Sequence, residues 1–207
     1  MPKILNRPTE SSLMSNYSRS DLAFVSGKGV WLFDKKGKMF LDLASGIAVN
    51  SLGHSHPRLV KVLVDQGSKL WHTSNLYTVP NQEKLAKLLT SNTFAEKVFF
   101  TNSGAESVEC AIKIARRFFF SIGQSERNRI ISFDGAFHGR TMGTISAAGS
   151  RKLLEGFGPK LPGFDPIKNF SLESVEKKIS RRTCAILVEP ILGEGGIVPL
   201  TCSFLKG

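Results

Sequence analysis

The sequence has no long apolar segment. No uninterrupted apolar run approaches the roughly 20 residues that a membrane-spanning helix needs. The start, MPKILNRPTESSLMSNYSRSD, has no apolar core of the kind found in a secretory signal, and Glu10 and Asp21 are not typical of a transit peptide. We therefore expect no membrane partner and a cytoplasmic location.

The sequence is also poor in residues that form disulfides or bind metals. Its three cysteines, Cys110, Cys184 and Cys202, lie far apart and lack metal-ligand spacing. This pattern fits a reduced compartment better than a disulfide framework. The three histidines nearest the start also lack the spacing of a metal site, and we interpret them as structural: His54, His56 and His72. The sequence predicts no metal centre.

Acidic residues are scarce beside basic ones. The chain has 17 Asp and Glu against 28 Lys and Arg, which gives a formal charge of +11. Such a charge suits a nucleic-acid partner. The basic residues, however, are scattered in pairs such as Lys35-Lys36 and Arg181-Arg182, without an arginine-aromatic recognition motif. We predict a solvated basic surface that can attract anionic metabolites, and no nucleic-acid partner.

The first part of the chain contains a hairpin pattern followed by helical patterns. Two apolar runs in GVWLFDKKGKMFLDL, residues 29–43, flank a polar turn and predict a β-hairpin. The glycine-rich string GIAVNSLGHSHP predicts a loop. Helical spacing of leucine and valine then predicts helices in PRLVKVLVDQGSKLW and NQEKLAKLLTSN.

The rest of the chain alternates between strand and helix patterns, which is typical of an α/β fold with parallel strands. Strands are predicted at Lys97–Phe100, Arg129–Phe133 and Cys184–Val188. A helix is predicted from Ala105 and another in SLESVEKKIS. The helix residues expected to face the sheet are Ala105, Val108, Ala111, Ile112, Ala115 and Phe119. Residues 149–170, rich in glycine and proline, are expected to form an extended surface connection.

A polar loop follows each of the three predicted strands. The loops read TNSGAE, DGAFHGRT and EPILGEGG. Because ligands of open α/β sheets bind outside the carboxyl ends of the strands, these loops predict a composite site.

The loop TNSGAE leads from a strand into a helix. Free N–H groups at such a helix start, with Gly104 allowing close approach, favour a phosphate ester. Ser103 and Glu106 also match a capping box, which would need no ligand. The sequence leaves both interpretations open.

The other two loops offer aromatic, basic and acidic groups. Phe137 can stack on a flat ring, and Arg140 can bind a carboxylate through two hydrogen bonds. A lone loop histidine such as His138 is more often a structural hydrogen-bonding group than a catalyst. Glu189 can pair with an arginine, orient a neighbour or face water, and the sequence does not choose.

Longer strings match a known family in order and at similar spacings. They are GKMFLDLASGIAVNSLGHSHP, SNLYTVPNQEKLA, VFFTNSGAESVECAIKIARR, ISFDGAFHGRTMGT and VEPILGEGG. They resemble the ω-aminotransferases of class III, which use pyridoxal 5'-phosphate. Within the family, SNLY, FHGRT and GFGPKLPGF are most similar to enzymes acting on N-acetylornithine. Ornithine, 4-aminobutyrate and succinyl-diaminopimelate aminotransferases are near relatives.

The resemblance implies a fold and a division into domains. The fold is the α/β, aspartate aminotransferase-like fold type I of pyridoxal-phosphate-dependent transferases, here truncated. Residues 1–57 would be the N-terminal segment of the small domain, with its β-hairpin and loop. Residues 58–207 would be the first, incomplete part of the large cofactor-binding domain, with its mostly parallel sheet.

The resemblance also implies roles for residues that match its motifs. Those expected to bind the cofactor are Ser103, Gly104 and Ala105 at the phosphate, Phe137 on the pyridine ring, and His138 in the same loop. Those expected near the substrate are Arg140 at the α-carboxylate, Glu194 as the partner of a switch arginine, Glu189, Asn50 and Tyr77. The expected partners are amino-acid and 2-oxo-acid substrates and a second copy in a homodimer.

The chain departs from the family in two respects. Leu192 stands where the motif usually has glutamine, from which we expect a changed secondary hydrogen bond. In the family, the lysine that binds the cofactor covalently and the aspartate at its ring nitrogen come later than Gly207. The resemblance therefore implies no catalytic residue within these 207 residues, which alone would be inactive. A non-catalytic binding remnant is the alternative.

Overall fold

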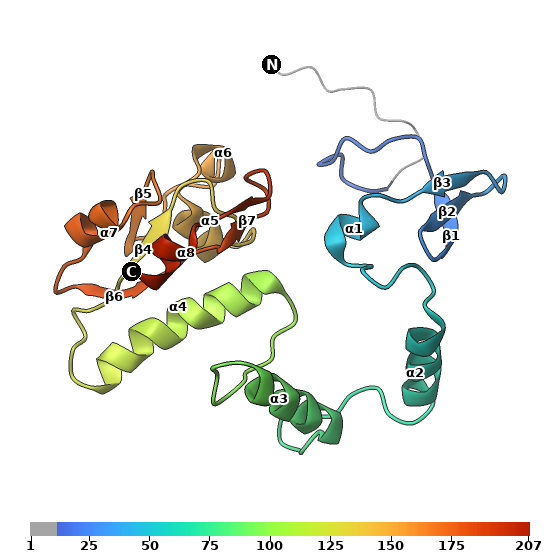
Figure 1. Cartoon of the computed structure of the whole chain (residues 1–207), viewed down its shortest axis with the longest axis horizontal. Helices are drawn as coiled ribbons and strands as arrows, with labels where there is room; N and C mark the ends of the chain where they lie inside the picture. The colour runs from blue at the N-terminus through green and yellow to red at the C-terminus, as the bar shows by residue number, and fades with distance from the viewer. Residues whose placement is uncertain (1–11) are drawn as a thin grey trace. The chain divides into compact units, whose positions relative to one another are not determined.

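The computed structural model describes residues 12–207 of the chain. Contacts divide the chain into two units, residues 1–85 and 86–207, and each is described by itself (Figure 1). Residues 1–11 lie outside the described residues. They make up about half of the N-terminal string in which the sequence predicts no signal or transit peptide. The domain boundary predicted after residue 57 stays a prediction.

A three-stranded antiparallel sheet opens the first unit. Its strands are β1 (Phe24–Lys28), β2 (Trp31–Asp34) and β3 (Met39–Leu41), in the order β1-β2-β3. The Asp34 carboxylate accepts hydrogen bonds from the amides of Lys36 and Lys38 at 2.8 and 2.9 Å, which closes the β2–β3 turn. The predicted hairpin is thus confirmed, and β1 adds a strand that the sequence pattern did not predict.

The helices of the first unit follow the predicted segments. They are α2 (Pro57–Gly67) and α3 (Pro80–Asn92), the latter continuing into the second unit. The short α1 (Ser45–Ala48) occupies part of the expected loop, with left-handed φ values of 64° at Gly46 and 61° at Ile47. His54 of this loop binds Asp42, with 2.7 Å between Nε2 and Oδ2. Hydrogen bonding of this kind is what the structural interpretation of His54 predicted.

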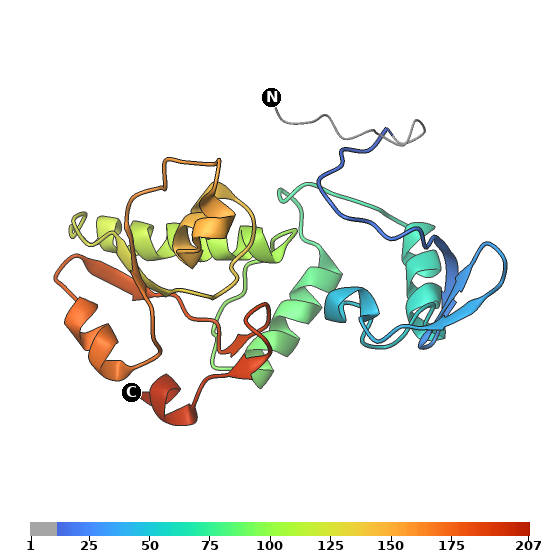
Figure 2. The same cartoon turned by 90° about the horizontal axis from the view of Figure 1, so that it is seen from above.

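A parallel sheet forms the centre of the second unit. Its strands are β4 (Arg129–Phe133), β5 (Phe164–Ile167) and β6 (Thr183–Ile186), in the order β5-β4-β6. The helices α4 (Gly104–Ser121) and α7 (Leu172–Lys178) lie along opposite sides of it (Figures 1 and 2). This layered arrangement confirms the predicted α/β class.

The sheet is buried from both faces. On one face, Ile112 of α4 packs in a cluster with Ile130 and Phe164. On the other face, Val175 of α7 packs in a cluster with Phe133 and other apolar side chains. Neighbouring residues of β4 thus point into different clusters, as the alternation of side chains along a strand requires.

The predicted strands were only partly correct. Arg129–Phe133 is confirmed as β4, and the strand predicted at 184–188 is β6, which begins and ends earlier. Lys97–Phe100 is not a strand, because no described segment pairs with its backbone. An extended segment becomes a strand only when a neighbour completes its hydrogen bonds.

The expectation that residues 149–170 form a surface connection was wrong. This stretch contains α6 (Arg151–Leu154) and β5, whose Phe164 and Ile167 are buried. Pro166 interrupts the apolar pattern of β5, but β5 lies at the edge of the sheet, where a missing N–H is tolerated. The string between the predicted strands also forms α5 (Met142–Ala148), which is almost fully buried.

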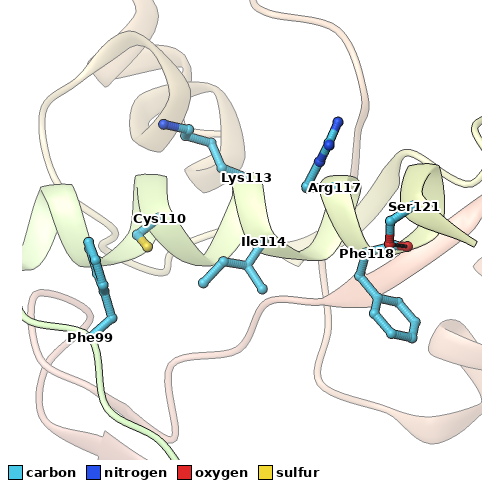
Figure 3. Close-up of a pocket in the computed structure, with 7 residues that line it drawn as sticks. All are labelled: Phe99, Cys110, Lys113, Ile114, Arg117, Phe118 and Ser121. Carbon is cyan, nitrogen blue, oxygen red and sulfur yellow. Dashed lines mark hydrogen bonds between the residues drawn. The ribbon is translucent and has the colours of Figure 1, made fainter.

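Helix α4 faces the sheet with most of its predicted residues. Ile112 is buried, but Ala111 is exposed, which corrects the predicted face at that position. The outer surface of α4 has an apolar hollow of about 560 Å³. Phe99, Ile114 and Phe118 line it below the helix, while Lys113 and Arg117 point upward (Figure 3).

The end of the chain forms a small hairpin and a helix. They are β7 (Ile191–Leu192), β8 (Val198–Pro199) and α8 (Cys202–Lys206). Phe204 of α8 packs edge-on against Phe133 with 5.7 Å between ring centroids. Among residues 12–207, no helix is long and apolar enough to cross a membrane.

Candidate functional site

The candidate site lies at the carboxyl edge of the parallel sheet. Residues 134–141 follow β4 and residues 189–196 follow β6, and these two strands are neighbours in the sheet. The third predicted loop, residues 101–106, leads into α4.

Helix α4 begins with a side-chain cap. Ser103 is the N-cap residue, and its Oγ accepts a hydrogen bond from the amide of Glu106 at 3.2 Å. The Glu106 carboxylate in turn accepts from the amide of Asn102 at 2.6 Å. The capping interpretation of this sequence is therefore confirmed.

The cap leaves the first amides of the helix free. Within residues 12–207, the N–H groups of Gly104 and Ala105 have no hydrogen-bond acceptor. A Cβ added at Gly104 would meet no atom within 4 Å, so the space above this residue is open. Free amides at a helix start attract anions through the helix dipole. The residues present therefore fit a phosphate group, and capping does not compete with this role.

A glycine brings the DGAFHGRT loop against this helix start. Gly139 has a φ of 118°, and a Cβ there would lie 2.7 Å from the Cβ of Ala105. No other residue could approach α4 so closely in this conformation. The Thr141 hydroxyl also donates a hydrogen bond to Glu109 of α4. The loop and the helix start therefore lie on the same side of the sheet.

Phe137 and Arg140 lie together in this loop. The Arg140 guanidinium carbon lies 5.6 Å from the centroid of the Phe137 ring. Phe137 is half-buried, whereas Arg140 is exposed and makes no salt bridge within the described chain. The loop thus places a guanidinium with no carboxylate partner among the described residues beside an aromatic ring.

Glu189 joins the two loops. Its carboxylate accepts a hydrogen bond from the amide of Phe137 at 2.8 Å and another from the amide of Gly193 at 3.0 Å. Of the three possibilities that the sequence left open, Glu189 therefore orients its neighbours. Glu194 is exposed and has no hydrogen bond or ion pair in the part of the chain that the structure describes.

His138 is buried without a hydrogen bond. It is 6% exposed, and its Nε2 has no partner among the described residues. The expectation of a structural hydrogen bond was wrong, because the ring is buried and no described residue supplies Nε2 with a donor or acceptor. Burial lowers the pKa of His138 below its ordinary value of 6.5, and the Glu189 carboxylate opposes this shift. The imidazole is therefore neutral at neutral pH.

The remaining predicted residues are placed differently. Asn50 and Tyr77 belong to the first unit, so their predicted place near the substrate stays a prediction. Leu192 is buried in β7, and its side chain can form no hydrogen bond. Glu109 and Thr141, which fasten the loop to α4, were missed because only the tertiary structure brings them together. Across residues 12–207 no cluster of histidine, cysteine or acidic side chains could hold a metal ion.

Comparison with known proteins decides the family. Residues 14–207 match the family described as Aminotransferase class-III. The chain belongs to the class-III aminotransferases. This family depends on pyridoxal 5'-phosphate, so the fold, the cofactor and the resemblance predicted from the sequence are confirmed.

Curated members of the class III family are similar over almost the whole chain. The chain is 56% identical over 196 residues to an acetylornithine aminotransferase of Mesorhizobium japonicum, covering 95% of this chain and 49% of that protein. It is 56% identical over 194 residues to the acetylornithine aminotransferase of Agrobacterium fabrum, covering 94% and 49%. The chain thus spans about half the length of these relatives.

Solved structures of aminotransferases share the fold. An ornithine aminotransferase from Toxoplasma gondii superimposes with a TM-score of 0.87 at 27% identity, covering 94% of this chain and 47% of that one. The N-acetylornithine aminotransferase of Stenotrophomonas maltophilia has a TM-score of 0.75 at 37% identity, covering 93% and 48%.

The role of Glu189 in holding the loops can be tested with a matched pair of variants. Glu189→Ala leaves the amides of Phe137 and Gly193 without their acceptor, and we expect it to lower the free energy of unfolding by about 1–3 kcal/mol. Glu194→Ala, in the same loop but at a side chain with no hydrogen bond or ion pair among the described residues, should change it by less than about 0.5 kcal/mol. Chemical denaturation measures both, and equal effects would contradict the assignment.

The environment of His138 predicts its titration. Because its folded pKa lies below the unfolded value of about 6.5, the unfolded chain takes up more protons as the pH falls through this range. His138 should therefore make the fold less stable below about pH 6.5, and His138→Asn should reduce that loss. An NMR titration of the ring should give a midpoint below 6.5. A midpoint at or above that value would refute the burial effect.

Proposed function

We propose that the protein carrying these residues transfers the amino group of N-acetylornithine to 2-oxoglutarate, giving N-acetylglutamate semialdehyde and glutamate. The names of the relatives at 56% identity support this substrate. The observation that carries the proposal is the close approach of Gly139 to Ala105, since it puts the aromatic and basic loop beside the anion-binding helix start.

The residues of α4 and its neighbouring loop hold the cofactor in this proposal. The amides of Gly104 and Ala105 and the Ser103 hydroxyl bind the phosphate, and Phe137 packs against the ring. The Nε2 of His138 in this loop is buried without a partner among the described residues, so it is available for a hydrogen bond. When bound, pyridoxal 5'-phosphate supplies the electron sink for the electron pair left by a departing proton.

The exposed charges of the two loops hold the substrates. Arg140 binds the α-carboxylate through paired hydrogen bonds, because its guanidinium makes no salt bridge to any described residue. Glu194 is likewise free to pair with an arginine, which would let the site accept both an amine-bearing chain and a dicarboxylate. Glu189 keeps Phe137 and the glycine-rich turn in place. Asn50 and Tyr77 belong in this proposal to segments near the substrate entrance and the subunit contact.

The proposal includes the expected partners and location. The substrates are a small amino acid and a 2-oxo acid, the complete protein is a homodimer, and a cytoplasmic location stays a prediction. The alternative is aminotransferase activity on ornithine, 4-aminobutyrate or succinyl-diaminopimelate. The TM-score of 0.87 with an ornithine aminotransferase is the reason to include ornithine among the substrates tested.

Binding of the phosphate can be tested on the 207-residue chain. Pyridoxine 5'-phosphate is the suitable probe, because it lacks the aldehyde that would react with surface lysines. Gly104→Asp puts a carboxylate into the open space and should weaken binding at least about tenfold. Ala111→Asp, on the exposed face of the same helix, should change it less than about twofold. Calorimetry measures both, and equal losses would refute the helix-start site.

Amino-group transfer can be tested on the natural gene product that carries these residues. The amino donors to compare, each with 2-oxoglutarate, are N-acetylornithine, ornithine, 4-aminobutyrate and succinyl-diaminopimelate. We expect the highest kcat/KM for N-acetylornithine. Arg140→Gln should lower kcat/KM by about 100-fold, since it removes a bidentate carboxylate contact. Cofactor binding without transfer from any of these amines would support the non-catalytic alternative instead.

A further inference from the structure

A cavity lies at the amino edge of the parallel sheet, opposite the carboxyl edge that holds the candidate cofactor site. It has a volume of about 310 Å³. Its lining comes from the residues at the starts of all three strands together with one side chain of α4: Asn128, Arg129, Pro162, Gly163, Arg182 and Arg116. Because the strands are parallel, this edge is the one away from the candidate cofactor site. Nothing in the proposed transamination uses it.

Arg116 is fixed in this cavity. Its Nε donates to the carbonyl of Asn128 at 3.0 Å, and its Nη2 donates to the carbonyl of Pro162 at 3.2 Å. The guanidinium also lies over the Phe164 ring, 5.2 Å from its centroid. A Cβ at Gly163 would collide with Nη2, so the glycine makes room for the charge. The guanidinium is therefore ordered before any ligand arrives, which lowers the entropic cost of binding.

The two other arginines keep donors available. Arg129 makes a bidentate pair with Asp165, with 2.7 Å between Nε and Oδ2. This pair lowers the pKa of Asp165, which stays ionised. A guanidinium has more N–H donors than this pair uses. The Arg182 side chain is exposed and has no hydrogen bond in the described part of the chain.

The charge of the cavity is positive. Three arginines line it, while Asp165 is the carboxylate paired with one of them. Lys178 and Arg182 also act on Asp165 through their charges and so lie close to it. A concave surface with one sign of charge concentrates counter-ions. Planar guanidinium groups match the paired oxygens of phosphate better than a lysine does.

We propose that this cavity, defined by Arg116, Arg129 and Arg182, binds a small anion that carries two linked phosphate groups. The volume is at the lower end of small-molecule sites, which span about 300–1,000 Å³. Arginines from α4, from β4 and from the turn before β6 line one hollow, as recognition of a compact multiply charged anion requires. A nucleic acid would instead need a stripe of basic residues along an open surface.

Inorganic pyrophosphate is the probe for the test. We expect it to shift the backbone amide signals of Gly163 and Arg182 in a saturable way when added to the ¹⁵N-labelled 207-residue chain. Arg182→Gln should raise the Kd at least about fivefold by removing a charge from the cavity. Arg181→Gln is the matched control, because it removes the same charge from the neighbouring exposed residue that does not line the cavity, and it should change the Kd less than about twofold.

Two further measurements separate the cavity from the helix-start site and from the effect of charge alone. In the Gly104→Asp variant, pyrophosphate should still shift the amide signals of Gly163 and Arg182. This result would show that the cavity binds independently of the helix-start site, whether or not that site binds phosphate. Arg182→Lys keeps the charge but loses the planar guanidinium, so it should bind pyrophosphate more weakly than the unchanged protein does. It also provides a second variant if Arg182→Gln does not fold.

Several results would overturn the proposal. Equal effects of Arg182→Gln and Arg181→Gln would mean attraction by the general basic surface. Equal affinity for orthophosphate and pyrophosphate would contradict a site for two linked phosphates. Displacement of pyrophosphate by duplex DNA at equal phosphate concentration would indicate a nucleic-acid surface, and no shift at up to about 10 mM pyrophosphate, above the millimolar range of weak binding, would exclude the site.

Discussion

The arrangement of residues 86–207 depends on the burial of the last four residues of β4, Ile130–Phe133. Ile130, Ile131 and Phe133 are at most 1% exposed. A strand that is apolar on both faces is stable only when helices cover both sides and other strands flank it. Because β5 and β6 run parallel to β4, all three carboxyl ends meet at one edge of the sheet and all three amino ends at the other. The candidate cofactor site lies at the first of these edges, and the arginine-lined cavity lies at the second.

At each edge of the sheet a glycine helps to position hydrogen-bond donors, which are backbone amides at the carboxyl edge and arginine side chains at the amino edge. At the carboxyl edge, Gly139 lets a loop approach the start of α4, where amides are free. At the amino edge, Gly163 makes room for the guanidinium of Arg116. In both places the absence of a Cβ on glycine allows a close approach, to the start of α4 at Gly139 and to the guanidinium of Arg116 at Gly163. Both edges therefore favour anions, which agrees with the formal charge of +11.

The interactions at the helix start show why a common sequence pattern and a specific site can coincide. Ser103 caps α4 by accepting from Glu106, yet this bond uses only one of the orphan amides of the first turn. The amides of Gly104 and Ala105 remain available among the described residues. Capping orders the turn, and the ordered turn presents the amides that a phosphate needs.

The sequence by itself determined the local elements and the family. The alternation of strand and helix patterns predicted β4, the Ser103 cap predicted the start of α4, and the motifs around the loops predicted the class-III aminotransferase family. The tertiary structure alone decided the rest. It made β5 a strand and gathered the arginines of the amino edge. Within residues 12–207 it also left Lys97–Phe100 unpaired and buried the Nε2 of His138 without a partner. The physical reason is that periodicity and capping depend on residues within a turn or two, whereas strand pairing, burial and converging charges depend on residues far apart in the chain.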